Sequence, residues 1–148
     1  MKKVFEEGYS FSEKRIFTEG ELKKLAKDCG DMNLIHHDSN LAKATRFSGI
    51  IASGSAMSAI FSAMIPTHLS QFSPMLGLEM SFKFPKPIKA NMDILMTWHI
   101  THVLNKPNAE QLMELAGEIT DSEGSPLIIG AAKVILLPNY DNREKAQA

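Results

Sequence analysis

An aspartate and a histidine in the first quarter of the chain have the residue types and spacing of a catalytic pair. Asp31 and His36 are five residues apart, and Gly54, further along, opens a long apolar segment. On an α-helix, five residues correspond to a rotation of about 500°, which leaves the two side chains about 140° apart. We therefore expect the pair to act together only from an irregular loop, which Gly30 and Asn33 favour.

The chemistry that suits these residues is addition of water to an alkene conjugated with a carbonyl group, or its removal. A carboxylate and an imidazole supply a general acid and a general base, and imidazole titrates near neutral pH. A helix beginning at Gly54 would aim its first N–H and its positive end at a developing oxyanion. Other roles stay open: Asp31 as a turn residue, His36 as a structural hydrogen bonder, and His37 as a rival base.

The composition is that of one ordinary globular domain. The chain has 148 residues, 44% of them hydrophobic, and a formal net charge of -1, which gives no reason to expect nucleic acid or a membrane as partner. The single cysteine, Cys29, excludes an intrachain disulfide and disfavours a zinc site. We favour a small buried residue at a helix end over a catalytic thiol for Cys29. We expect no signal peptide, no membrane span and a cytoplasmic protein.

Two helical segments are predicted before the long apolar one. A capping box formed by Thr18 and Glu21 begins a helix over 19–28, in which apolar residues recur at helical spacing. One or two further turns are expected over 39–44.

The long apolar segment predicts a central helix over 54–65, where Pro66 should end or kink it. Because its side chains are almost all small or apolar, we expect the rest of the domain to wrap it. The other segments have strand-like composition and short connections, which favour antiparallel neighbours. The expected strands are 11–17, 75–84, 93–103, 112–120 and 126–137. The sequence thus predicts one α+β domain over 1–148, a sheet curled around a helix, with a frayed tail over 139–148.

This order of elements and the loop sequence resemble the hot dog fold of the MaoC-like, (R)-specific enoyl-CoA hydratase family. That family has an Asp, an Asn-Pro pair, a His and a second Asp on one loop. An Arg-Phe-Gly-Gly segment and a His-Gly pair that starts the helix follow, and the helix carries a serine. The matching residues here are Asp31, Asn33, His36, Asp38, Arg46, Phe47, Gly49, Gly54 and Ser62, and the resemblance extends over 11–137.

The chain departs from the family pattern within the same segments. Leu34 stands where proline is usual, Ser48 replaces a glycine, and Ala90-Asn91 stands where Gly-Asp often closes a turn. Ser53 replaces the histidine of the His-Gly pair, a residue that supports the site in this family. A backbone donor does not depend on side-chain identity, so we still expect an oxyanion donor at the following glycine.

The resemblance implies a lyase that hydrates trans-2-enoyl thioesters to (R)-3-hydroxyacyl thioesters, or catalyses the reverse dehydration. The CoA or acyl-carrier-protein thioester is the substrate, and no cofactor or metal is implied. Asp31 and His36 would hold one water, with the Gly54 N–H as oxyanion donor. A homodimer or a dimer of dimers is expected.

Four residues are expected to support the substrate or the loop in this interpretation: Asn33, Asp38, Ser53 and Ser62. Asn33 and Asp38 are expected to tie the loop down, and Ser62 is either a packing residue or a hydrogen-bond partner of Asp31. Two other functions stay open: a hot dog acyl-CoA thioesterase, and a non-catalytic acyl-thioester-binding protein, which Ser53 and Leu34 make more plausible.

Overall fold

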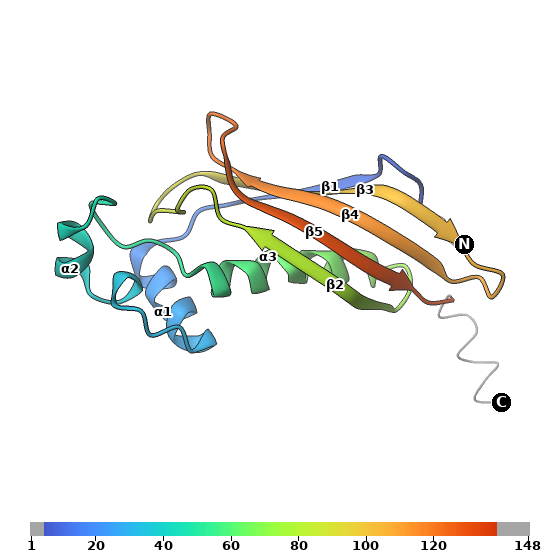
Figure 1. Ribbon diagram of the computed structural model, residues 1–148, viewed down its shortest axis with the longest axis horizontal. Coiled ribbons are helices and arrows are strands. Elements are labelled where there is room, and N and C mark those ends of the chain that lie inside the picture. The colour runs from blue at the N-terminus through green and yellow to red at the C-terminus, as the bar shows by residue number, and fades with distance from the viewer. Residues whose placement is uncertain (1–4, 139–148) are drawn as a thin grey trace.

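The structure is a computed structural model that describes residues 5–138, in which a curved sheet lies over one long helix (Figure 1). The sheet has five strands in the order β1-β3-β4-β5-β2, and all neighbours are antiparallel. The elements are β1 (Ser10–Arg15), α1 (Glu19–Cys29), the 3-10 helix η1 (Leu34–His36), α2 (Ser39–Ala44), α3 (Gly54–Leu69), β2 (Met75–Lys83), β3 (Ile94–Asn105), β4 (Gln111–Thr120) and β5 (Pro126–Leu136). This is the α+β arrangement that the sequence predicts.

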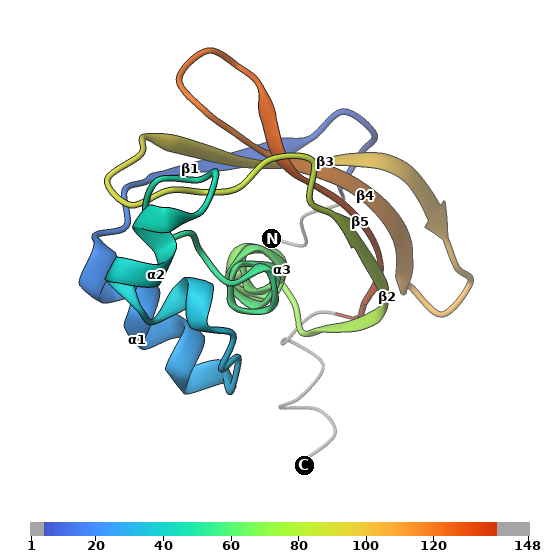
Figure 2. The same ribbon diagram turned by 60° about the vertical axis from the view of Figure 1, so that its left-hand side comes forward.

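Helix α3 lies in the hollow of the sheet, as Figure 2 shows. Its largest fully buried side chains recur at every fourth position: Met57, Phe61, Ile65 and Leu69. Trp98 of β3 stacks on the Phe61 ring, with centroids 4.3 Å apart, and its Nε1–H donates to the Phe61 carbonyl at 2.9 Å. A Cβ on Gly117 or Gly130 would come within 2.5 or 2.7 Å of the indole. These two glycines therefore let the indole lie flat between sheet and helix.

Helix α3 continues for a further turn past Pro66, so the prediction that it ends near residue 65 is wrong. Proline removes only its own N–H from the helix ladder, and the Pro66 carbonyl still accepts from the Ser70 N–H at 2.9 Å. The added turn buries Leu69 completely. Burying such a side chain contributes about 1.5–3 kcal/mol, which offsets most of the ~3 kcal/mol cost of an interior proline.

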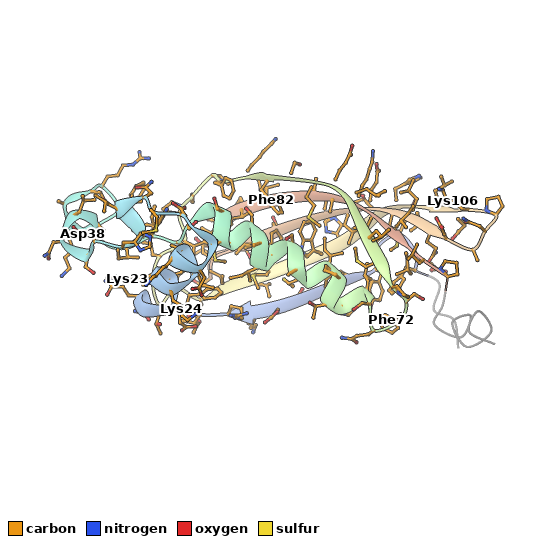
Figure 3. The ribbon with its side chains drawn as sticks, turned by 90° about the horizontal axis from the view of Figure 1, so that it is seen from below. Lys23, Lys24, Asp38, Phe72, Phe82 and Lys106 are labelled. Carbon is orange, nitrogen blue, oxygen red and sulfur yellow. The ribbon has the colours of Figure 1, made fainter. Side chains whose placement is uncertain are left out.

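The sheet wraps around α3 as expected, but it leaves one face of the helix exposed. The exposed residues recur every fourth position: Ser55, Ala59, Ala63 and Thr67. Seen from the side away from the sheet, no other described element lies over the middle of α3 (Figure 3). The sheet curls around only part of the helix, and the remaining face is left for solvent or for another chain.

The other predicted elements are confirmed to within two residues at each end. The Thr18 hydroxyl accepts from the Glu21 N–H, the Glu21 carboxylate accepts from the Thr18 N–H, and Gly30 ends α1 with a φ of 84°. The predicted frayed tail over 139–148 lies outside the described residues. Among the helices that the structure describes, none is both long enough and apolar enough to cross a membrane.

Candidate active site

The loop that follows α1 holds Asp31 and His36, and its own side chains fix its shape. The Asn33 N–H donates to Asp31 Oδ1 at 3.2 Å, and Asn33 Oδ1 accepts from the Ile35 N–H at 3.3 Å, which starts η1. Asp38 caps α2 by accepting from two N–H groups at 3.0 Å each. Asn33 and Asp38 thus act on the backbone of the loop, as expected of residues that tie it down.

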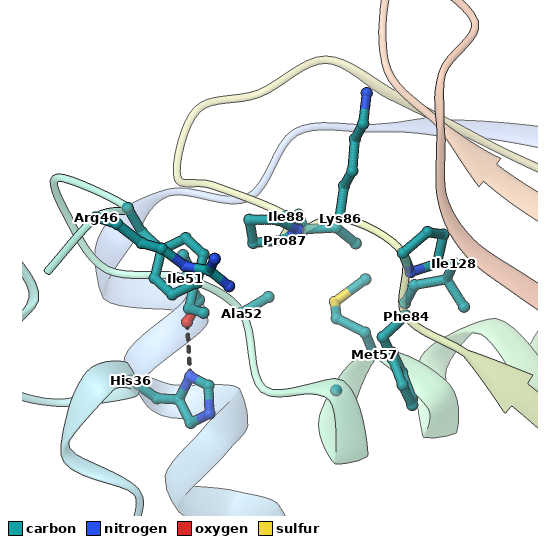
Figure 4. Close-up of a pocket in the computed structure, with 13 residues that line it drawn as sticks. His36, Arg46, Ile51, Ala52, Met57, Phe84, Lys86, Pro87, Ile88 and Ile128 are labelled. Carbon is teal, nitrogen blue, oxygen red and sulfur yellow. Dashed lines mark hydrogen bonds between the residues drawn. The ribbon is translucent and has the colours of Figure 1, made fainter.

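The irregular loop brings the two candidate catalytic side chains together. Nε2 of His36 lies 3.3 Å from Asp31 Oδ2, and the side chains are 8% and 22% exposed. The other ring nitrogen, Nδ1, lies 2.8 Å from the Ile51 carbonyl oxygen (Figure 4). Because a carbonyl oxygen only accepts hydrogen bonds, Nδ1 carries a proton. The tautomer fixed in this way has its other ring nitrogen, Nε2, on the side of Asp31.

Ser53 connects this pair to the start of the central helix. Its hydroxyl donates to Asp31 Oδ2 at 2.5 Å and accepts from the Ala56 N–H at 3.2 Å, so one buried side chain caps α3 and holds the carboxylate. This hydrogen bond is the main cause that lowers the pKa of Asp31, with smaller contributions from the Asn33 N–H and the nearby imidazoles, while burial acts in the opposite direction. Asp31 is therefore ionised at neutral pH.

Replacing Ser53 by alanine is expected to raise the pKa of Asp31, because it removes the largest cause of the lowering. A carboxyl group whose pKa is lower in the folded than in the unfolded protein adds to the free energy of unfolding at every pH above its unfolded-state pKa. This contribution is lost as the pH falls through the pKa of the folded state. The Ser53→Ala variant should therefore lose stability at a higher pH than the parent, besides about 1 kcal/mol for the missing cap. A carboxyl ¹³C NMR titration and acid unfolding measure the two effects.

The matched control is Ser62→Ala, since the Ser62 hydroxyl donates to the Ala59 carbonyl at 2.9 Å within the same helix. We expect this variant to leave the titration of Asp31 unchanged. An unchanged Asp31 titration in Ser53→Ala would show that the hydrogen bond does not set the charge of the site.

Gly54 begins α3 directly after Ser53 and lines the cavity beside His36. Its N–H belongs to the first helical turn, where N–H groups have no acceptor within the helix. A Cβ at this position would lie 3.1 Å from Cε1 of Phe84, so the aromatic ring packs against the bare backbone. The N–H and the positive end of the helix dipole are thus placed at the cavity wall, where they can stabilise an anion.

The cavity has a volume of about 290 Å³ and is largely apolar. Figure 4 shows Met57, Phe84, Ile88 and Ile128 around it, with His36 at one end. The arrangement offers a base and a backbone donor in the wall of a space that fits a short acyl chain.

Three candidates from the sequence lie elsewhere or have other partners. Ser62 bonds within its own helix, and Ser53 is the serine that holds Asp31. His37 Nε2 lies 2.6 Å from the Asp31 backbone oxygen, which commits that nitrogen to the loop backbone. Cys29 is exposed, so the expectation that it is buried is wrong: the core covers α1 at Leu22 and Ala26 but does not reach the helix end.

Sequence reasoning missed two contacts of this site. The Ile51 carbonyl that fixes the imidazole and the bond from Ser53 to Asp31 both join segments more than ten residues apart. A serine before an apolar helix is a recognisable N-cap. That signal identifies the bond to the Ala56 N–H, but nothing local predicts a bond to a carboxylate on another loop.

The family model for the MaoC like domain matches residues 2–121. The chain belongs to this family of hydratases and dehydratases. No curated protein sequence matches it significantly.

Solved structures of three proteins support the same fold. The (R)-hydratase from A. caviae involved in PHA biosynthesis is 22% identical with a TM-score of 0.79, covering 92% of this chain and 99% of its own. The R-hydratase PhaJ1 from Pseudomonas aeruginosa is 25% identical, with a TM-score of 0.76. The match covers 91% of this chain and 83% of the PhaJ1 chain. The MaoC-like dehydratase from Rhodospirillum rubrum is 18% identical, with a TM-score of 0.77. The match covers 91% of this chain and 94% of the dehydratase chain. This MaoC-like chain therefore has the hot dog fold.

Proposed function

We propose that this MaoC-like protein is a lyase that adds water to trans-2-enoyl thioesters, giving 3-hydroxyacyl thioesters, or removes it in the reverse direction. The observation that carries the proposal is the pairing of His36 Nε2 with Asp31 Oδ2 at 3.3 Å, beside an apolar cavity that begins at the N-terminus of α3. Family membership and the likeness to (R)-hydratases support it.

The pair is suited to hold a single water. In the proposed mechanism the imidazole of His36 reacts as the free base. Oδ2 of Asp31 and Nε2 of His36 are then two acceptors close to one another, and a water has two O–H groups to donate. Such a water keeps its lone pairs free to attack C3 of the enoyl group. The bond between its oxygen and C3 forms as Nε2 takes one of its protons. That proton passes through Asp31 to C2, so that H and OH are added across the double bond.

Negative charge gathers on the thioester oxygen during the attack. The Gly54 N–H and the positive end of α3 are the groups that would stabilise it, and one such donor contributes about 3–4 kcal/mol to the transition state. We propose that the apolar cavity holds the acyl chain, that CoA or acyl-carrier protein supplies the thioester, and that no cofactor or metal takes part. The (R) configuration of the product is proposed from the family alone.

Crotonyl-CoA distinguishes this activity from its alternatives. Loss of the enoyl absorbance with the thioester intact supports a hydratase. Release of free thiol instead would indicate a thioesterase, and neither change would indicate an acyl-thioester-binding protein; both results contradict the proposal.

We also propose that the protein acts in the cytoplasm as a homodimer, or as a dimer of dimers, joined along β2. This edge strand exposes Leu76, Leu78 and Met80, which are 57%, 49% and 40% exposed, and it has no partner on its outer side among the described residues. Unprotected apolar edges favour pairing with another chain. The opposite edge, β1, carries the charged run 13–15.

Light scattering at micromolar concentration tests this assembly, and we expect the mass of two or four chains. Leu78→Lys should shift the protein toward the monomer, because it places like charges opposite one another across the two-fold axis. Ser12→Lys on the other edge is the control and should leave the mass unchanged. A parent protein that is monomeric and fully active would contradict the dimer.

A further inference from the structure

The wall of the catalytic cavity opposite His36 comes from three separate elements (Figure 4). Met57 comes from α3, Ile128 from β5 and Phe84 from the segment directly after β2. The residues that follow on the same faces decide whether the cavity continues between the helix and the sheet. Their positions follow from the spacing of side chains, because a helix face repeats after about four residues and a strand face after two.

The residues at these next positions bring aromatic rings together behind the cavity. They are Phe61 on α3, Gly130 on β5 and Phe82 on β2. The ring centroids of Phe61 and Phe82 are 6.2 Å apart, and Trp98 of β3 stacks on the Phe61 ring at 4.3 Å. The side chains of Phe61, Phe82 and Trp98 are called the aromatic layer below.

The aromatic layer fills the space between α3 and the sheet at Gly130. A Cβ on this glycine would lie 2.7 Å from Cη2 of Trp98, 3.1 Å from Cε2 of Phe61 and 3.2 Å from Cε1 of Phe82. All three distances are shorter than the optimal separation of two carbon atoms, which is about 3.5–4.0 Å. Because not even a methyl group fits between the rings at this point, an acyl chain has no path through the layer.

Two of the three rings are fixed in place. Phe61 and Trp98 are fully buried, and the Trp98 Nε1–H donates to the Phe61 carbonyl oxygen at 2.9 Å. Displacing the indole would leave this buried donor without its acceptor, which folded proteins avoid. Phe82 is only partly buried and lies on the edge strand β2, so its ring can be removed with the least disturbance to the core.

We infer that the aromatic layer closes the inner end of the acyl cavity and restricts the protein to enoyl thioesters with short acyl chains. The inference rests on the proposed hydratase function, which places the thioester between His36 and Gly54. The acyl chain then runs from the N-terminus of α3 past Met57. The aromatic layer begins one helical turn further, about 6 Å along the helix axis. A crotonyl chain ends before the layer, whereas a decenoyl chain is long enough to meet its rings.

The test compares the chain-length preference of Phe82→Ala with that of the parent. We expect the kcat/KM of the parent for trans-2-decenoyl-CoA to be at least about tenfold below its value for crotonyl-CoA, because the added methylenes find no space. Phe82→Ala should raise the ratio of the decenoyl to the crotonyl value by about tenfold or more. Phe72→Ala is the matched control, since it removes another partly buried ring beyond the opposite end of α3 (Figure 3), and it should keep the ratio of the parent.

A second variant keeps the test valid if Phe82→Ala does not fold. Phe82→Leu retains an apolar side chain in the aromatic layer and should raise the same ratio by a smaller factor. A parent that hydrates both substrates equally well would overturn the inference, and so would a folded Phe82 variant with the ratio of the parent.

Binding of saturated thioesters, measured by calorimetry, separates this inference from the hydratase function. Each methylene that becomes buried raises the affinity by about fourfold. Decanoyl-CoA should therefore bind more tightly than butyryl-CoA to Phe82→Ala but not to the parent. A parent that binds decanoyl-CoA much more tightly than butyryl-CoA would overturn the inference. If this difference in binding is found but crotonyl-CoA is not hydrated, only the proposed hydratase function is contradicted.

Discussion

Replacing His36 by alanine is expected to lower the rate of crotonyl-CoA hydration by at least about 10²-fold, the low end for a positioned base. The Ile51 carbonyl fixes the tautomer in which Nε2 has the free lone pair, and no other described imidazole has a ring nitrogen within an ion-pair distance of the Asp31 carboxylate. The loss should fall mainly on kcat, followed as loss of enoyl absorbance. The fold should survive, because His36 lies on a loop beside a cavity.

The neighbouring histidine supplies the control. His37→Ala should leave kcat almost unchanged and cost only about 1 kcal/mol of stability, the contribution of its hydrogen bond to the Asp31 backbone oxygen. If His37→Ala were the damaging change and His36→Ala nearly silent, the assignment of the base would be wrong.

Asp31→Asn should also reduce hydration by at least about 10²-fold. Asparagine preserves the shape of the side chain and can still accept the Ser53 hydrogen bond, but it carries no charge and cannot relay a proton. The comparison therefore separates the charge of Asp31 from its place in the loop. Circular dichroism and thermal unfolding should show a folded protein.

The double variant Asp31→Asn/His36→Ala should be little worse than either single variant, because groups that act on one water are not additive. Losses that multiply would mean that the two residues act independently. That result would contradict a shared water even if each single variant were strongly impaired.

The catalytic loop could be predicted because its signals are local. Gly30 ends a helix in the left-handed conformation, and the Asn33 side chain starts the next turn, both through the ordinary chemistry of these residue types. Because Asp31 and His36 are five residues apart in the sequence, they could not share one face of a helix. The structure brings them to 3.3 Å by such a loop.

The end of the central helix could not be predicted, because tertiary packing outweighs the local signal. Pro66 indicates a helix end when only its neighbours are considered. The burial of Leu69, three residues later, depends on the sheet, which no local pattern places over the helix. The exposed face of α3 has the same origin, since how far a sheet curls is set by all its strands together.

The hydrogen-bond partner of the Asp31 side chain could not be predicted from the sequence either, because it comes from a distant segment. The resemblance left Ser62 open as the hydrogen-bond partner of Asp31, whereas the structure gives that hydrogen bond to Ser53. The Ser53 hydroxyl caps the helix and binds the carboxylate, and it is the largest cause that lowers the pKa of Asp31. Ser48, which replaces a glycine of the family pattern, has a φ of 60°, a conformation that favours glycine.

Hydration of crotonyl-CoA in D₂O, with the product analysed by NMR and by a chiral assay, tests the single-water mechanism most directly. If Asp31 and His36 deliver hydroxyl and proton from one water on one side of the alkene, both must arrive on the same face. We predict syn addition, which follows from the geometry of the site. We also predict the (R)-3-hydroxyacyl product, which follows from the family alone. A syn but (S) product would discredit the family-based configuration alone, whereas anti addition would contradict the mechanism whatever the rate.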